Sequence, residues 1–188
     1  LYYMYYVNQL VLNGELNNVG AFIRTNSGKS FRSGIELGAL AKLSKQWELT
    51  GNVSFSNNRN LDFKVENESG VQDLGNTQIS FSPEVIANLG IRFNPDKNFQ
   101  FALTNQYVGK QYLDNSEDQN LQLKDYFLTD FNAQYQFKIK NNDIALKLLV
   151  NNIFNKKYVN NGAVYDGSPY YFSQAGTNFM FGISWKIQ

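Results

Sequence analysis

The chain has 188 residues and a formal net charge of +1, so it lacks the basic excess that would predict binding to nucleic acid. It contains no cysteine and no histidine, which excludes a disulfide framework, a thiolate metal site and the commonest general base of enzymes. We therefore expect no enzyme, no metal site and no cofactor. Its mean hydropathy is -0.42 although 15% of the residues are aromatic, a combination that suits a wall with one apolar face and one wet face.

The sequence predicts no transmembrane helix, because no stretch approaches the roughly 18 consecutive apolar residues that one requires. The first residues, Leu1–Tyr6, lack the basic flank and the apolar stretch of a signal peptide. We therefore expect a mature or internal segment of a longer protein.

Apolar and polar residues alternate along most of the chain, and this period of two predicts β-strands. Between Phe127 and Lys140, for example, Phe131, Ala133 and Tyr135 alternate with polar neighbours. Eight strands are expected in chain order: Leu1–Leu12, Phe31–Leu43, Gln46–Ser56, Ile79–Asn94, Asn98–Tyr112, Leu123–Lys140, Asp143–Tyr158 and Phe172–Ile187. The predicted fold class is all-β.

The predicted connections alternate between short and long. Tight turns are expected at 44–45, 94–97 and 140–142, whereas the segments 13–30, 57–78, 113–122 and 159–171 are long and polar. Short turns at one end and long loops at the other are typical of an antiparallel transmembrane β-barrel in a bacterial outer membrane. Aromatic residues near the strand ends fit the two girdles where such a barrel meets the lipid headgroups.

Three alternatives remain beside this interpretation. A soluble β-sandwich could use the same aromatic residues as an inter-sheet core. A self-contained eight-stranded outer-membrane barrel with a structural or adhesion role is also permitted, since eight strands can close. An outer-membrane lipase would need a histidine that the chain does not contain.

Five motifs resemble those of TonB-dependent outer-membrane receptors, and they occur in that family's order. They are Arg32-Ser33-Gly34-Ile35-Glu36, Ile79-Ser80-Phe81-Ser82-Pro83-Glu84, the segment Tyr107–Asn115, the segment Val150–Tyr158 and Gly182-x-x-Trp185-x-Ile187. The last is similar to the C-terminal signal for barrel assembly, although Ile187 stands where an aromatic residue is usual and Gln188 follows it.

The resemblance implies that residues 1–188 form the C-terminal segment, the last eight strands, of a 22-stranded barrel with a plugged lumen. It implies active import of a scarce nutrient, such as siderophore-bound iron, cobalamin or a saccharide, across the outer membrane. The expected partners are membrane lipid, the N-terminal strands and plug domain of the same receptor, a small-molecule or metal-chelate ligand, and TonB through the plug. The plug and the N-terminal strands are absent from these residues.

Two groups of site residues are predicted. An outer loop carries an aromatic and amide set that could stack on a ligand or simply pack: Asn160, Asn161, Tyr165, Tyr170 and Tyr171. A second set occupies polar strand positions and could face the lumen, where it would contact water or the plug: Arg32, Glu36, Glu84, Arg92 and Asp130. The acidic residues Asp114, Glu117 and Asp118 lack the spacing of a calcium loop, so we expect them to be solvated.

Overall fold

A computed structural model describes residues 1–26, 28–67 and 70–186 of the chain. Its strands account for most of this length, and the helical structure within the described ranges is one short 3-10 turn, η1 (Gln119–Leu121). No helix within those ranges is long and apolar enough to span a membrane. The predicted all-β fold class is confirmed.

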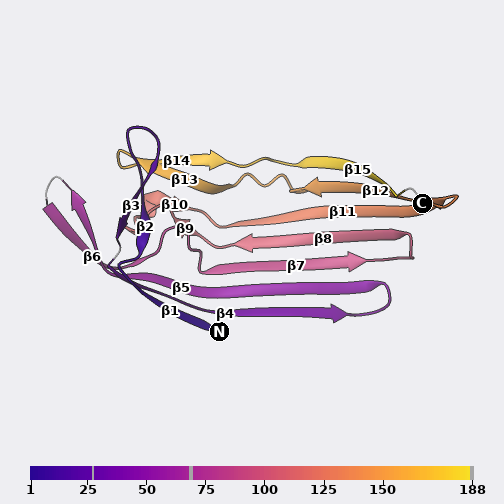
Figure 1. Cartoon of the computed structure of the whole chain (residues 1–188), viewed down its shortest axis with the longest axis horizontal. Helices are drawn as coiled ribbons and strands as arrows, with labels where there is room; N and C mark the ends of the chain where they lie inside the picture. The colour runs from indigo at the N-terminus through magenta and orange to yellow at the C-terminus, as the bar shows by residue number, and fades with distance from the viewer. Residues whose placement is uncertain (27, 68–69, 187–188) are drawn as a thin grey trace.

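A continuous antiparallel sheet forms the body of the molecule (Figure 1). Its strands follow one another in the order β1-β4-β5-β7-β8-β11-β12-β15, so each pairs with its neighbours along this path. The bounds are β1 (Tyr2–Val7), β4 (Lys29–Lys42), β5 (Trp47–Asn67), β7 (Val85–Phe93), β8 (Phe99–Val108), β11 (Tyr126–Ile139), β12 (Asn142–Asn151) and β15 (Asn178–Lys186). Each of these strands overlaps one of the eight predicted from the sequence.

The tight turns β4–β5, β7–β8 and β11–β12 gather at one end of the sheet, and the long connections gather at the other (Figure 1). The long connections are themselves folded. They contain β2 (Leu10–Leu16), β3 (Phe22–Asn26), β6 (Gly70–Gln78), β9 (Gln111–Tyr112), β10 (Gln122–Leu123), β13 (Val159–Tyr165) and β14 (Ser168–Ser173). The expected long polar loops are therefore mostly hairpins, with β6 paired to the long extension of β5.

Several predicted strand bounds were wrong, and local backbone chemistry gives the reason. The strand expected from Ile79 begins at Val85, because Pro83 has no N–H to donate and Phe81 has a positive φ of 51°. The strand expected to run to Tyr158 ends at Asn151, where Asn152 turns the backbone with a φ of 50°. Ile187, assigned to the last predicted strand, lies outside the described residues.

Strand register separates the side chains onto two faces, because residues directly opposite each other in an antiparallel pair share a face. One row across five strands is entirely apolar: Ile91, Leu103, Phe131, Val150 and Phe179. On the opposite face, a row of neighbours is mostly polar: Gln100, Gln134, Lys147 and Gly182. The sheet thus has an apolar face and a polar face, and we use these two names below.

Aromatic rings stack across neighbouring strands close to the tight turns. Trp47 of β5 stacks on Phe93 of β7 with ring centroids 4.4 Å apart. Phe99 of β8 stacks on Tyr135 of β11 with centroids 4.3 Å apart. This arrangement is the one expected of an aromatic girdle at a membrane interface.

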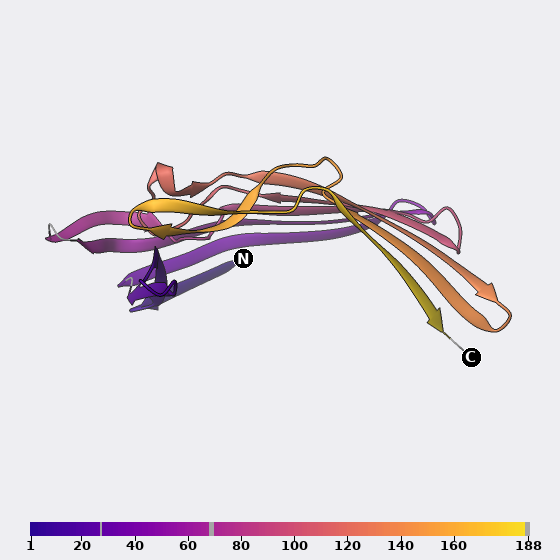
Figure 2. The same cartoon turned by 90° about the horizontal axis from the view of Figure 1, so that it is seen from above.

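The strand order ends at β1 on one side and at β15 on the other, and no pairing joins these two strands in the described part of the chain. Figure 2 shows the sheet from above as a curved, open layer. A self-contained eight-stranded barrel would require a ladder between β1 and β15. The structure therefore favours a segment of a larger barrel over that alternative.

The two faces differ in what they tolerate, which adjacent residues of β11 can test. Phe131→Arg places a charge on the apolar face and should cost about 2–4 kcal/mol of folding free energy if that face contacts lipid near mid-depth. Asn132→Arg, at the same depth on the polar face, should assemble normally. The measurement is the amount of heat-modifiable folded barrel in outer membranes, and equal losses for both variants would refute the face assignment.

Candidate functional site

The hairpin β13–β14 carries all five residues of the predicted aromatic and amide set. Its turn, Asp166-Gly167, has positive φ at both positions, 49° and 67°, as a tight two-residue hairpin turn requires. Tyr165 and Tyr170 lie edge to face, with ring centroids 6.4 Å apart and an interplanar angle of 69°. Both rings are about half exposed, so they offer a surface on which a planar or apolar ligand could stack.

The other three members of the set differ in their surroundings. Tyr171 donates its hydroxyl hydrogen toward the carbonyl oxygens of Asn120 and Gln122, at 3.3 and 3.4 Å, so it braces the hairpin against the neighbouring loop. The Oδ1 atom of Asn161 accepts a hydrogen bond from Gly162 N at 2.8 Å. Asn160 is exposed and lies where the β13–β14 register shifts. The structure thus pairs Tyr165 with Tyr170 and separates them from the amides.

A small apolar core lies beneath this hairpin. Leu113, Leu121, Leu123 and Val164 are buried together, with Phe81 and Val159 packed against them. Gly162 permits the close packing, because a Cβ there would lie 2.6 Å from the carbonyl oxygen of Tyr170. Three connections that are distant in sequence therefore form one folded body, which we call the loop core.

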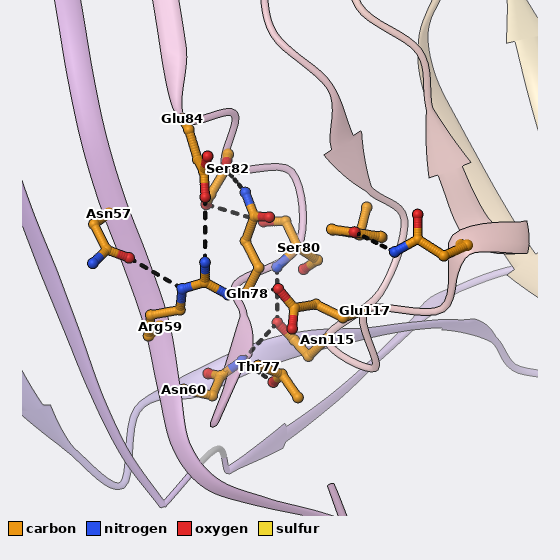
Figure 3. Close-up of polar contacts among 12 residues, drawn as sticks. Asn57, Arg59, Asn60, Thr77, Gln78, Ser80, Ser82, Glu84, Asn115 and Glu117 are labelled. Carbon is orange, nitrogen blue, oxygen red and sulfur yellow. Dashed lines mark hydrogen bonds and ion pairs between the residues drawn. The ribbon is translucent and has the colours of Figure 1, made fainter. Parts of the chain in front are cut away.

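Buried amide side chains join the loop core to the main sheet (Figure 3). The Oδ1 atom of Asn115 accepts hydrogen bonds from Ser80 N at 2.8 Å and from Asn60 Nδ2 at 3.2 Å. Asn60, on the extension of β5, also donates to Thr77 Oγ1 at 3.3 Å. Because Asn60 and Asn115 are almost fully buried, water cannot replace these bonds.

Arg59 adds a charged connection beside the amides (Figure 3). Its guanidinium donates to Glu117 at 2.5 Å and to Glu84 at 3.3 Å, while Nε donates to Asn57 Oδ1 at 3.1 Å. One cation thereby links β5, the residue that precedes β7 and the loop before η1. Glu117 is thus ion-paired, which corrects the expectation that this acidic residue is merely solvated.

Burial raises the pKa of the Asp114 carboxyl above its ordinary value of 3.8. The nearby Asp118 carboxylate also raises it, while hydrogen bonds from Ser116 N and Oγ lower it in part. Asp118 itself caps η1 by accepting from Asn120 N at 2.8 Å. Within the described ranges, no group of three His, Cys, Asp or Glu residues could hold a metal ion.

Asn152 fixes the point where the hairpin β13–β14 leaves the sheet. Its Oδ1 accepts from Lys156 N at 2.8 Å, and its Nδ2 donates to the carbonyl oxygens of Lys156 at 2.9 Å and Ala175 at 3.4 Å. Thr177 Oγ1 donates to the carbonyl oxygen of Asn152 at 2.7 Å. One buried amide therefore ties the strand leading into the hairpin to the strand that leaves it.

The five predicted lumen-facing residues do not form one site. Arg92 is paired with Glu48 at 2.6 Å, Glu84 is paired with Arg59, and Asp130 accepts a hydrogen bond from Asn152 N at 2.7 Å. The guanidinium of Arg32 lies 5.5 Å from the ring centroid of Tyr6, and its buried Nε has no hydrogen-bond partner among the described residues. Glu36 lies opposite Ser54 in the register of the β4–β5 ladder.

The amides and the cation that join the elements were not predicted from the sequence. Asn152 lies inside the Val150–Tyr158 motif, which offered a signal. Arg59, Asn60 and Asn115 stand in polar segments rich in similar residues, where nothing in the local pattern distinguishes a buried amide from an exposed one.

Removal of the Asn115 side chain tests how firmly the loop core is attached. Asn115→Ala leaves the Ser80 N–H and the Asn60 amide without this buried acceptor, at a cost of about 1–3 kcal/mol. Hydrogen–deuterium exchange of residues 79–84 should therefore accelerate. Asn161→Ala, which loses only a bond to the adjacent backbone, is the control, and equal acceleration by both variants would contradict the role assigned to Asn115.

The raised pKa of Asp114 predicts a pH dependence of loop stability. The folded loop favours the protonated form of the Asp114 carboxyl, so this proton stabilises the loop at low pH. As pH rises from about 4 toward 7, the unfolded loop releases the proton before the folded loop does, and the stabilisation is lost. Asp114→Asn is neutral at every pH, so the stability of its loop should lack this pH dependence. The ratio of wild-type to variant proteolysis of residues 111–123, taken at each pH, should rise with pH, whereas a flat ratio would contradict the prediction.

Comparison with known proteins identifies the family. The family model for the β-barrel of TonB dependent receptor-like proteins matches residues 1–153. A search of curated proteins gave no match.

Similar solved structures cover most of this chain. The siderophore receptor PiuA from Acinetobacter baumannii aligns with a TM-score of 0.70 and 19% identity over 96% of this chain and 24% of that one. The ferric citrate transporter FecA in its unliganded form gives 0.68 and 20% over 87% and 25%. The ferric-catecholate import receptor Fiu from E. coli K12, in its closed form, gives 0.66 and 17% over 96% and 24%.

At these identities the structures show a shared fold, and the chain spans about a quarter of each receptor's length. The family match extends over most of the chain, including seven of the eight strands on the path from β1 to β15. This chain belongs to the TonB-dependent receptor family, within its outer-membrane β-barrel.

Proposed function

We propose that residues 1–188 are the C-terminal barrel segment of an outer-membrane receptor that imports a scarce nutrient. The observation that carries the proposal is the two-faced open sheet, whose long connections fold into a shared loop core at one end. A sheet of this kind would serve as a barrel wall with a binding surface at its outer end. The missing strands would pair with β1 and β15, and a plug would occupy the lumen.

The proposed cargo is a ferric chelate. The names of the similar structures support this class, since they are receptors or transporters for siderophores, ferric citrate and ferric catecholates. Tyr165 and Tyr170 present half-exposed rings at the tip of β13–β14, where aromatic parts of a chelate could stack. Cobalamin and saccharides are the competing cargo classes.

The plug is the proposed partner of those charged residues of the polar face that have no partner within the described part of the sheet. Arg32 is the strongest of the five candidates, because its Nε is buried without a partner among the described residues. Glu36 is the next, whereas Arg92, Glu84 and Asp130 already have partners within the wall. Coupling to TonB would pass through that plug.

Uptake by cells that depend on the intact receptor tests the cargo and the two tyrosines together. Tyr165→Ala combined with Tyr170→Ala should weaken binding of a ferric catecholate about tenfold, because stacked aromatic contacts contribute about 0.5–1.5 kcal/mol each. Tyr165→Phe with Tyr170→Phe keeps both rings and should bind as the wild type does. Uptake of radioactive iron as ferric catecholate and as ferric citrate is the measurement.

Failure of the wild-type receptor to take up either chelate would refute the ferric cargo. Uptake of cobalamin or of an oligosaccharide by the same cells would then identify the competing class. Normal iron uptake by the double alanine variant would retain the cargo and refute the role of the two tyrosines.

A further inference from the structure

The near-neutral net charge of the chain conceals an uneven distribution of charge along the sheet. At the end with the tight turns, the described residues include eight basic side chains and three acidic ones. The basic residues are Lys42, Lys45, Arg92, Lys97, Lys138, Lys140, Lys147 and Lys186, and the acidic residues are Glu48, Asp96 and Asp143. Acidic residues consequently predominate toward the long loops, since the formal net charge of the whole chain is +1.

Four of these lysines line a single open hollow bordered by β11, β12, β15 and the turn that precedes β8. Lys97, Lys138, Lys147 and Lys186 border it together with the amides of Gln134 and Gln136. Asp143 is the acidic residue in this hollow, and it forms an ion pair with Lys138 at 3.4 Å. We call these four lysines the basic patch.

Strand register assigns three lysines of the basic patch, Lys138, Lys147 and Lys186, to the polar face, whereas Lys97 lies in the turn before β8. Lys147 lies opposite Gln134 and Gly182, and Lys186 lies opposite Asp143, which in turn faces Lys138. The next residues along the strands, Ile144 and Trp185, are opposite each other on the apolar face. These three lysines therefore lie on the face opposite the one that would meet lipid headgroups.

The basic patch contains four lysines but only one neighbouring carboxylate, Asp143, among the described residues that line the hollow. In the described part of the chain, Lys97, Lys147 and Lys186 have no ion-pair partner, whereas Glu48 elsewhere on this end is paired with Arg92. Lysine ammonium groups bordered by amides recognise carboxylates through charge-assisted hydrogen bonds. A surface of this kind attracts an acidic polypeptide segment rather than a basic or neutral one.

We propose that the basic patch docks an acidic segment of the polypeptide that fills the barrel lumen, near its tight-turn end. This inference rests on the proposed function, because that function makes the polar face the lumen. The lumen-filling polypeptide is the proposed plug. The inference adds a second contact surface for it, at the tight-turn end, and assigns a negative charge to the plug segment that binds there. An anionic phospholipid is the competing occupant, and the polar-face position of the patch argues against it.

Photo-crosslinking within the intact receptor, in outer membranes, tests the occupant directly. A photoreactive amino acid at Gln134 should capture a peptide of net negative charge from the same receptor, identified by mass spectrometry. The same amino acid at Tyr135, one residue along β11 on the apolar face, should capture lipid. Capture of lipid, or of a neutral or basic peptide, at Gln134 overturns the proposal, and so does no product there while Tyr135 reacts.

Charge variants test whether the lysines provide the attraction. Lys147→Glu with Lys186→Glu should lower the yield of the Gln134 product about tenfold, whereas Lys147→Arg with Lys186→Arg should preserve it. Lys45→Glu with Lys140→Glu makes the same charge change in the neighbouring turns and should also preserve it. Equal losses in both pairs of glutamate variants overturn the proposal.

Two further comparisons keep the outcome interpretable. Lys147→Gln with Lys186→Gln removes the charge without reversing it and replaces the glutamate pair if that pair fails to assemble, with the same loss of product expected. Iron uptake is measured in parallel. If Gln134 captures an acidic peptide but the cells take up no iron, only the ferric cargo is refuted. If Gln134 captures lipid while iron uptake is normal, only the docking surface is refuted.

Discussion

The structure depends on the requirement that every backbone N–H and C=O within a hydrocarbon layer has a hydrogen-bond partner inside the protein. The antiparallel ladders from β1 to β15 meet that requirement strand by strand. Because the ladders hold the backbone extended and pleated, side chains alternate between the two faces of the curved sheet. The same requirement explains why β1 and β15 cannot remain free edges in lipid, and it connects the open sheet to the larger barrel of its family.

Outside the sheet, side chains supply the hydrogen bonds that the ladder no longer provides. Asn115 accepts from the backbone N–H of Ser80, and Asn152 bonds both the N–H and the C=O of Lys156. These amides lie where strands end and connections leave, so they fix the positions from which the loops extend. The leucines of the loop core then cover the join with apolar contacts. Consequently the hairpin β13–β14 has a defined position relative to the sheet.

Two carboxylates at the tight-turn end of the sheet lie beside lysine or arginine residues of the neighbouring strands. Glu48 lies between Lys42 and Arg92 in the ladder, and Asp143 lies between Lys138 and Lys186, so each carboxylate has a cation on both sides. These rows leave a surplus of cations at the tight-turn end. Arg59 shows the opposite case near the loops, where one cation serves two carboxylates. The two ends of the sheet thus differ in their balance of charge.

The sequence by itself determined the fold class, the eight strands of the sheet, the division between short turns and long connections, and the assignment of residues such as Phe131 and Asn132 to opposite faces. All of these follow from a period of two and from turn residues, which are local properties of the chain. The motifs in their order also indicated the family. Strand ends were less predictable, because the breaks at Phe81 and Asn152 depend on single backbone conformations.

Only the tertiary structure decided that the polar connections fold into hairpins and that a leucine core lies beneath β13–β14. The same holds for the contacts of Arg59 with Glu117 and Glu84, and for the common burial of Asn60 and Asn115. Each of these contacts joins residues far apart in the chain, so no local pattern encodes it. The gathering of Lys138, Lys147 and Lys186 around one hollow likewise arises from strand register. Alternation sets the face of each residue, but register decides which residues of a face become neighbours.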